Sequence, residues 1–209
     1  SAFYLDILKD RLYTYPEKSR ERRAGQTTIY ILLMGMVRLI APILSFTAEE
    51  IWGYLPKGSA EEKSVHLSFF SNEVDLKFDD ELVCNWELLV QLKSEVSKAS
   101  EVSRRNKIIG HSLDSIVKLE LPGEIEKKVR KYSEELKFLF IVSKVELVSS
   151  LNDSKDVYVS DSLPGVKIFT EKHPGQKCER CWHHFDVESS VDNPSTCQRC
   201  QEHLKFFGE

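Results

Sequence analysis

Two short motifs stand near the C-terminus: Cys178-Glu-Arg-Cys181 and, after fifteen intervening residues, Cys197-Gln-Arg-Cys200. Each Cys-x-x-Cys pair forms a tight turn that offers two sulfurs to one ion, and two such turns complete the tetrahedral shell of Zn²⁺. A shell of four protein ligands has no open position for water, so we expect one structural zinc. The segment between the pairs is too polar to bury a core alone. Metal binding is therefore expected to supply much of its folding free energy, on the order of 10 kcal/mol in comparable peptides.

Other chemistries also use paired cysteines. The chain has five cysteines and no recognisable signal peptide, which argues against a secreted disulfide scaffold. A redox Cys-x-x-Cys begins the helix of a βαβ unit, and no such pattern surrounds Cys178. The fifth cysteine, Cys84, falls in an apolar helical pattern and is expected to be a small buried hydrophobe. Four histidines are close enough in sequence to act as substitute ligands: His173, His183, His184 and His203.

The overall charge does not indicate a nucleic-acid partner, because 33 acids against 29 Lys and Arg give a net charge of -4. Basic residues nevertheless concentrate locally, as in Lys18–Arg23, so a basic patch can exist on this acidic protein. The most apolar run, Ile29–Leu44, is interrupted by Arg38 and Pro42. It is shorter than the roughly 20 residues that cross a bilayer, so we interpret it as a buried helix and expect no membrane contact. These features favour the cytoplasm.

Helical periodicity covers the first half of the chain. Apolar spacing predicts helices over 3–14, 18–41, 47–55 and 79–107, the first continuing a pattern already under way at Ser1. The second is apolar around most of its circumference and should lie centrally in a bundle. The third should begin with a capping box formed by Thr47 and Glu50. The expected core stripe is Ile29, Leu32, Leu33, Met36, Trp52 and Trp86.

The pattern changes after about residue 108. Period-two alternation predicts strands over 115–121 and 144–148, with shorter ones at 157–159 and 166–169. A charged helix is expected over 124–132, and 136–141 is ambiguous between helix and strand. The predicted fold class is mainly α: a helical bundle (1–108), a small α+β junction module (109–172) and a zinc-binding module (173–209).

Several stretches resemble a known family. Asp10-Arg11-Leu12-Tyr13, Arg22-Arg23-Ala-Gly-Gln-Thr27 and Ala41-Pro-Ile-Leu-Ser-Phe-Thr-Ala-Glu-Glu-Ile-Trp52 look like the anticodon-binding helical domain of class I aminoacyl-tRNA synthetases. Arg105-Asn-Lys-Ile-Ile-Gly-His-Ser-Leu113 resembles the junction that follows this bundle in the isoleucine enzymes. The tail from Lys177 to Cys200 resembles the C-terminal zinc module of the bacterial-type isoleucyl-tRNA synthetase family.

The resemblance implies an ATP-dependent ligase that joins isoleucine to tRNA(Ile). The family's catalytic signatures, His-Ile-Gly-His and Lys-Met-Ser-Lys-Ser, are absent from this sequence, so it implies a C-terminal fragment with no catalytic residues. Such a fragment should be inactive alone, because ATP and Mg²⁺ would bind in the missing catalytic domain. The implied partners are the anticodon stem-loop of tRNA(Ile) and the catalytic and editing domains of the same enzyme, with the protein a monomer.

A protein that grips an RNA stem-loop needs cations for phosphates and planar groups for unstacked bases. Three arginines at the positive end of a helix do not serve helix stability, which favours an RNA role at 20–23, whereas arginines at 104–105 also suit a helix C-terminus. The tryptophan after Cys181 can either pack on the zinc core or stack on a base. The candidate RNA-binding residues are Arg20, Arg22, Arg23, Arg104, Arg105, Arg180 and Trp182. The basic residues of 127–131 are interpreted as a solvated helix face.

Two other functional classes remain open at this point. One is a free-standing zinc-ribbon module that docks a protein and never binds RNA. The other is a self-sufficient metalloenzyme, which would require an open position on the zinc.

Overall fold

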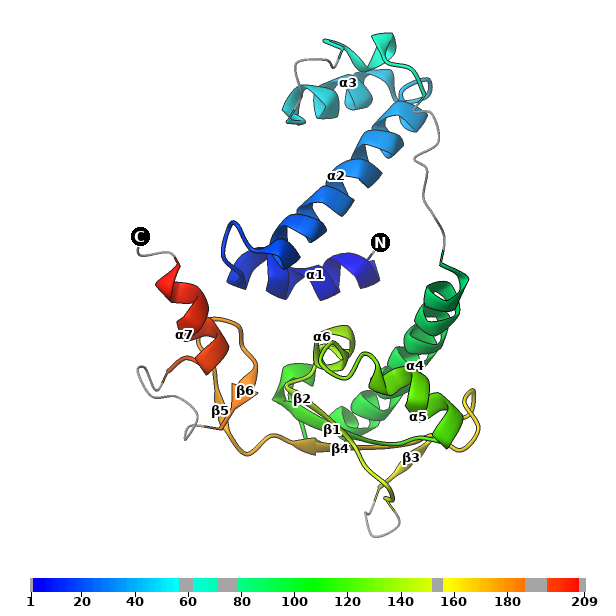
Figure 1. The fold of residues 1–209 in the computed structure, drawn as a ribbon, viewed down its shortest axis with the longest axis vertical. Helices are drawn as coiled ribbons and strands as arrows, with labels where there is room; N and C mark the ends of the chain where they lie inside the picture. Colours follow the sequence, from blue (N-terminus) through cyan, green and yellow to red (C-terminus); the bar gives the residue numbers. More distant parts are fainter. Residues whose placement is uncertain (1, 57–61, 71–78, 152–155, 187–194, 207–209) are drawn as a thin grey trace. The chain divides into compact units, whose positions relative to one another are not determined.

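The computed structural model describes residues 2–56, 62–70, 79–151, 156–186 and 195–206 (Figure 1). The helices are α1 (Ala2–Thr14), α2 (Arg20–Ile40), α3 (Ser45–Tyr54), α4 (Asp80–Arg105), α5 (Gly123–Arg130), α6 (Leu136–Phe140) and α7 (Gln198–Lys205), with 3-10 turns η1 (Val65–Leu67) and η2 (Ser112–Asp114). The strands are β1 (Ser115–Glu120), β2 (Lys144–Leu147), β3 (Tyr158–Val159), β4 (Lys167–Lys172), β5 (Gln176–Lys177) and β6 (His184–Phe185). The predicted class, mainly α with a small β module and a cysteine cluster, is confirmed.

The chain forms two compact units, Glu17–Lys77 and the combination of Ser1–Pro16 with Phe78–Glu209. The sequence pattern predicts three segments, with boundaries after residues 108 and 172. These boundaries differ from those of the two compact units. The difference arises because α1 and α4, expected in a helical bundle, contribute apolar side chains to the core around the sheet.

The Glu17–Lys77 unit is a pair of helices closed by a short turn. Trp52 of α3 is 1% exposed and packs with Met34 and Val37 of α2, while its indole N–H donates to the carbonyl of Glu62 at 3.0 Å. Within this unit α2 buries only one face. Leu32 and Met36 are more than half exposed, so their assignment to the core is wrong.

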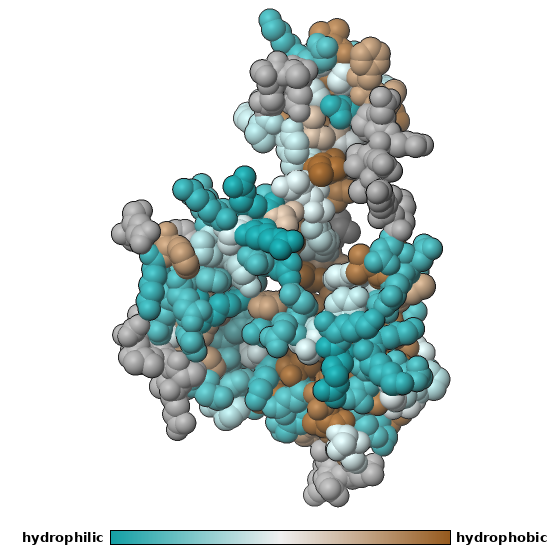
Figure 2. Space-filling model, viewed as in Figure 1, coloured by the Kyte–Doolittle hydropathy of each residue, from teal (hydrophilic) through white to brown (hydrophobic). Residues whose placement is uncertain are grey.

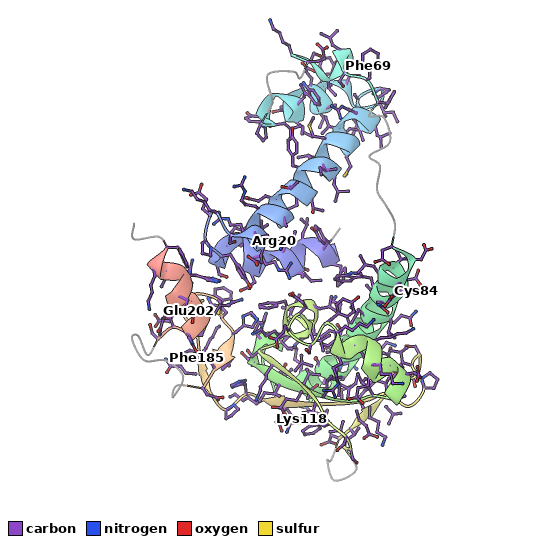
Figure 3. All side chains as sticks on the ribbon, viewed as in Figure 1. Arg20, Phe69, Cys84, Lys118, Phe185 and Glu202 are labelled. Atoms are coloured by element: carbon purple, nitrogen blue, oxygen red, sulfur yellow. The ribbon has the colours of Figure 1, made fainter. Side chains whose placement is uncertain are left out.

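Apolar side chains also lie on the surface of this unit (Figure 2). Phe46 and Phe69 are among the most exposed large apolar residues in the described chain. Phe69 is labelled in Figure 3.

The predicted capping box of Thr47 and Glu50 does not form. Instead, α3 begins earlier, at Ser45, with Leu44 as a cap that contributes no side-chain hydrogen bond. The backbone before it already turns, because the Leu44 N–H donates to the Ile40 carbonyl at 2.7 Å. The Ala48 N–H then bonds to the Leu44 carbonyl at 2.8 Å, which is the first hydrogen bond of α3.

The larger unit is built on a four-stranded sheet with the order β2-β1-β4-β3. β1 pairs in parallel with β2 and antiparallel with β4, so the connection through α5 and α6 is a crossover. These helices and α4 pack on the sheet around Leu92, Val117 and Ile168 (Figure 1). Lys118 alternates to the opposite face, where it forms an ion pair with Glu171 at 2.8 Å (Figure 3).

α4 follows its predicted pattern only in part. Asp79 caps the helix by accepting a hydrogen bond from the Leu82 N–H, and Leu89 is buried as expected. Trp86, expected in the core, is 42% exposed. Cys84 is also exposed (Figure 3), so its prediction as a buried hydrophobe is wrong. It falls to one side of the buried stripe of α4, where apolar spacing alone gave a misleading signal.

A buried carboxylate joins α4 to the β3–β4 connection. Glu95 is 1% exposed and accepts hydrogen bonds from the Ser160 hydroxyl at 2.6 Å, the Tyr158 hydroxyl at 3.1 Å and the Lys98 ammonium at 2.7 Å. Burial opposes ionisation, but these hydrogen bonds outweigh it and lower the pKa of Glu95 to about 2. Glu95 is therefore a charged, fully partnered group inside the core.

Replacing this carboxylate should destabilise the sheet unit. Because the pKa of Glu95 is lowered on folding, its contribution is complete above the usual value of 4.5 and is lost as pH falls towards 2. We expect Glu95→Gln to reduce the free energy of unfolding by about 1–3 kcal/mol at pH 7 and to flatten its pH dependence in that window. Hydrogen exchange of β4 amides in urea measures the change.

The matched control is Glu101→Gln on the same helix, which removes exposed ion pairs with Arg104 at 2.5 Å and Arg105 at 3.7 Å. Exposed pairs contribute little, so this variant should lose less than about 1 kcal/mol. Equal effects of the two substitutions would contradict the assignment of Glu95.

Candidate functional site

The two cysteine pairs come together in the structure. Their four sulfurs all lie within 4.8 Å of one another, and Cys178 and Cys200 are fully buried. The sulfurs of Cys181 and Cys197 are 3.7 Å apart, and none of the cysteines is in a disulfide. Four Zn–S bonds of about 2.3 Å in a tetrahedron place sulfurs about 3.8 Å apart, far beyond a disulfide bond. The donor set therefore fits a tetrahedral zinc ion.

A short hairpin presents the first pair. β5 and β6 pair antiparallel, and the Trp182 N–H donates to the Cys178 carbonyl at 2.9 Å, which closes the turn. Gly175 precedes the hairpin where a Cβ would lie 2.3 Å from the Phe185 carbonyl oxygen. A side chain at residue 175 would therefore force the two strands apart.

The second pair is placed by α7. Cys197 stands at the N-cap of this helix, and its N–H points to the sulfur of Cys178 at 3.4 Å. Cys200 lies one helical turn later, which turns both sulfurs to the same side. Local helix geometry thus sets the spacing of the second pair.

The thiols also influence one another's ionisation. A hydrogen bond with the Cys197 sulfur, together with burial, raises the pKa of the Cys181 thiol to about 12. The same contact lowers the pKa of Cys197, since one sulfur donates the proton that the other accepts. Zn²⁺ binds thiolates, so metal binding would release protons here and would be weakened at low pH.

No histidine joins the cluster among the described residues. The four histidines considered as substitute ligands engage backbone groups through Nδ1: His173 with the Gly175 N–H, His183 with the Cys181 carbonyl, His184 with the Leu113 carbonyl and His203 with the Thr14 carbonyl. Burial lowers the pKa of His173, His183 and His203, which favours their neutral forms. The contacts of His184 and His203 join the zinc module to the rest of its unit.

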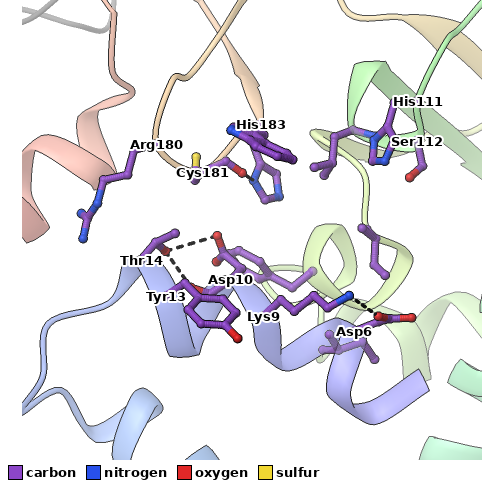
Figure 4. A pocket seen from close by; sticks show the side chains of 15 residues that line it. Asp6, Lys9, Asp10, Tyr13, Thr14, His111, Ser112, Arg180, Cys181 and His183 are labelled. Carbon is purple, nitrogen blue, oxygen red and sulfur yellow. Dashed lines mark hydrogen bonds and ion pairs between the residues drawn. The ribbon is translucent and has the colours of Figure 1, made fainter. Parts of the chain in front are cut away.

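A cavity of about 510 Å³ lies beside the first cysteine pair. One wall is α1, with Asp10, Tyr13 and Thr14, and the facing wall is the turn that carries Arg180 and Cys181 (Figure 4). Residues of η2 and α6 complete the lining. The cavity combines rings, hydroxyls and charged groups, a lining suited to a planar polar ligand.

Trp182 lies at this cavity in an unusual conformation. The residue is 58% exposed, and the Lys177 ammonium lies 4.9 Å from the centre of its ring. Its φ of 67° falls in the left-handed region, which costs a non-glycine residue roughly 1–2 kcal/mol. Phe185 is buried with the cysteines, whereas Trp182 does not belong to that buried cluster. A large exposed ring kept in a strained turn favours a binding role over a packing role.

The other candidate RNA-binding residues are more dispersed. Arg180 lines the same cavity as Trp182 and donates to the Cys200 carbonyl at 3.5 Å. Arg104 and Arg105 are exposed at the end of α4, and both form ion pairs with Glu101.

The remaining three arginines lie in the first turn of α2, in the other compact unit. Arg20 and Arg23 are exposed and Arg22 is half-buried, beside the cap formed by Ser19. Within the larger unit, the structure places Arg180 and Trp182 at one cavity and Arg104 and Arg105 beside Glu101 at the end of α4.

Sequence reasoning missed several residues of the cavity. Tyr13, His111 and Ser112 line it from segments about 100 residues apart in the chain. No spacing rule links these segments, and only the packing of α1 against the sheet unit brings them together. Arg199 was also missed, although its place between two cysteine ligands is a visible signal.

Comparison with known proteins gives the class. Residues 1–121 match the model of the anticodon-binding domain of tRNA ligases, and residues 175–202 match a zinc finger found in FPG and IleRS. The first match covers more than half of the chain, and the chain belongs to the family of tRNA-ligase anticodon-binding domains. The second match spans all four clustered cysteines, which supports a structural zinc.

Named relatives are isoleucine–tRNA ligases. That of Syntrophotalea carbinolica is 46% identical over 202 residues, which is 96% of this chain and 21% of the relative. Those of Geobacter sulfurreducens and Thermoanaerobacter sp. X514 are each 41% identical over 98% of this chain and 22% of their own length. The chain thus spans about a fifth of these relatives. No described helix has the length and apolar character needed to cross a bilayer.

The cysteine geometry predicts one bound zinc per chain. Cys200→Ser should abolish stoichiometric zinc, because a buried hydroxyl cannot replace the thiolate. Cys84→Ser is the matched control, since this thiol lies outside the cluster, and it should retain full zinc. Atomic emission on the dialysed protein measures zinc, and thiol titration before and after chelation measures the released cysteines. Loss of zinc from both variants, or from neither, would contradict the site.

Proposed function

We propose that this chain is the tRNA-binding portion of an isoleucine–tRNA ligase and binds the anticodon stem-loop of tRNA(Ile). The observation that carries the proposal is the cavity beside the cysteine cluster, with exposed Trp182 at its edge. The family match and the names of the relatives support the same assignment. Zinc, held by Cys178, Cys181, Cys197 and Cys200, has a structural role and fixes the turn that carries Trp182.

In this proposal, the cavity receives an unstacked base. Trp182 offers a π-face, and stacking of one base on an aromatic ring contributes about 1–3 kcal/mol. Arg180 lies two residues before it and can donate to a base edge or a phosphate. The strained backbone of Trp182 is then explained, because the turn holds the ring where the base binds.

The remaining arginines contact phosphates of the RNA backbone. Arg20, Arg22 and Arg23 bring three cations to the start of α2, where the helix dipole adds positive potential. Arg104 and Arg105 add positive charge for RNA phosphates at the end of α4, although their ion pairs with Glu101 partly neutralise that charge. Each cation that neutralises a phosphate makes binding more sensitive to salt.

The wider assignment follows from the relatives. We propose that ATP and Mg²⁺ act in a catalytic domain elsewhere in the same enzyme, which also contains an editing domain. This chain holds the tRNA while isoleucine is transferred at a remote site, and contributes no catalytic residue. The enzyme acts as a monomer in the cytoplasm, and the bundle, junction and zinc segments (1–108, 109–172 and 173–209) are its successive parts.

Trp182 can be tested without disturbing the metal. Trp182→Gly removes the ring and relieves the left-handed backbone, so the turn should be at least as stable as before. We expect affinity for an isoleucine-tRNA anticodon stem-loop to fall about 5- to 150-fold, which corresponds to about 1–3 kcal/mol of lost stacking. Trp182→Phe is the matched control, since it keeps an aromatic face, and it should retain most of the affinity.

Fluorescence anisotropy with a labelled stem-loop measures binding, and atomic emission measures zinc in the same samples. If Trp182→Gly loses zinc together with binding, Trp182 is structural and its assignment is wrong.

The arginines at the start of α2 can be tested by salt dependence. Arg23→Gln should weaken binding and reduce the slope of log affinity against log salt by about 1, the share of one phosphate contact. Lys127→Gln is the control, because Lys127 pairs with Glu124 on a solvated helix, and it should leave the slope unchanged. Absence of binding at about 50 mM salt, with zinc present, would favour the rival zinc-ribbon module that docks a protein.

A further inference from the structure

An ion pair connects two distant parts of the chain at the zinc module. Arg199, between the zinc-site cysteines Cys197 and Cys200, donates from both terminal nitrogens to the carboxylate of Asp10 on α1. The two distances are 2.6 and 2.8 Å, and the side chains are only 22% and 13% exposed. Two parallel hydrogen bonds fix orientation as well as distance, so this ion pair can position α1 against α7.

Aromatic rings surround the guanidinium. Its central carbon lies 5.4 Å from the Tyr15 ring centre and 5.2 Å from that of Phe138. Burial disfavours the charged form, but the hydrogen bonds to Asp10 outweigh burial and raise the pKa of Arg199. A lysine could not form this fork, because its charge sits on a single nitrogen.

A second contact lies one helical turn further along α7. His203 bonds through Nδ1 to the Thr14 carbonyl at 3.1 Å, and its ring centre lies 4.5 Å from that of Tyr15. The C-terminal turn of α1 is therefore held by α7 at two points. The same turn carries Tyr13 and Thr14, which line the cavity.

We propose that the Asp10–Arg199 ion pair is a positioning device that couples zinc binding to the shape of the cavity. Arg199 is flanked by two zinc ligands, so its guanidinium reaches Asp10 only when the second cysteine turn is formed. Once formed, the pair holds α1 against the zinc module and sets the distance between the two cavity walls. Neither residue is catalytic. The consequence for RNA rests on the proposed function, whereas the coupling to zinc does not.

Thermodynamic linkage makes the coupling reciprocal. If zinc strengthens the contact between α7 and α1, then breaking that contact must weaken zinc binding by the same factor. A direct electrostatic effect predicts a different pattern. Removing the negative charge of Asp10 near the cysteine thiolates would favour those thiolates and strengthen zinc binding, whereas removing the positive charge of Arg199 would weaken it. Coupling predicts weaker zinc binding in both cases.

The first experiment measures zinc affinity by competition with a chromogenic chelator. We expect Asp10→Asn and Arg199→Gln each to weaken zinc binding about tenfold. The double variant should bind zinc no more weakly than either single variant, because all three lack the same Asp10–Arg199 ion pair. Glu202→Gln, an exposed carboxylate on α7, is the matched control and should bind zinc normally. Opposite signs for the two single variants, or additive losses, would overturn the proposal.

Hydrogen exchange then distinguishes a local effect of the Asp10–Arg199 ion pair on α1 from a loss of stability of the whole unit. In the zinc-loaded chain, Asp10→Asn should speed exchange of the amides at the end of α1, and chelation should do the same in the unaltered chain, while β4 amides keep their protection in both. Loss of protection in β4 as well would mean that the pair stabilises the whole unit, and would overturn the positioning role.

RNA binding provides the last readout, with Arg199→Lys because Arg199 does not line the cavity. At saturating zinc this variant should bind the isoleucine-tRNA stem-loop at least fivefold more weakly, since it keeps the charge but loses the fork. Unchanged RNA affinity would overturn the proposal that the Asp10–Arg199 ion pair sets the shape of the cavity. If the unaltered chain binds no RNA while zinc coupling is present, the proposed function fails and the coupling stands.

Discussion

Repulsion and desolvation of four clustered sulfurs are the central constraint on the C-terminal part of this protein. The thiols lie within 4.8 Å of one another, and among the described residues Phe185 is the apolar side chain buried with them. Such a cluster is stable only when a cation compensates the charge of the thiolates. The hairpin of β5 and β6, the start of α7 and the exposed position of Trp182 all depend on that compensation. The metal therefore acts here in place of a hydrophobic core.

The zinc module is also attached by polar contacts instead of a large apolar surface. His184 donates from its backbone to the Ser143 hydroxyl at 2.6 Å, and Arg199 and His203 contact α1 on the other side. Hydrogen bonds of this kind are directional, so they fix orientation more strictly than apolar packing does. A binding surface formed between such a module and a helix is well defined when every contact is made, and is lost when the module shifts.

The sequence was most informative where the pattern is local. Cys-x-x-Cys spacing led directly to the cluster, and period-two alternation located β1 and β2 within a residue or two. Prediction of burial from the sequence failed where segments distant in the chain decide which side chains are covered. Cys84 and Trp86 have the spacing of core residues, yet both side chains are exposed in the part of the unit that the structure describes. Glu95 was not anticipated, because its partners Ser160 and Tyr158 come more than 60 residues later. The cavity was invisible for the same reason: α1 and the cysteine turn are separated by most of the chain.

The discontinuous composition of the larger unit has a consequence for synthesis on the ribosome. Residues 17–77 form a compact unit from one continuous stretch, so they can fold as soon as that stretch emerges. The larger unit combines residues 1–16 with 78–209 and includes a pairing of β1 with β4 across about fifty residues. Its first helix must therefore wait, with its apolar face uncovered, until the later segments of its unit have been translated. During that interval the nascent chain presents α1 to chaperones, and a delay in translation of those later segments prolongs this exposure.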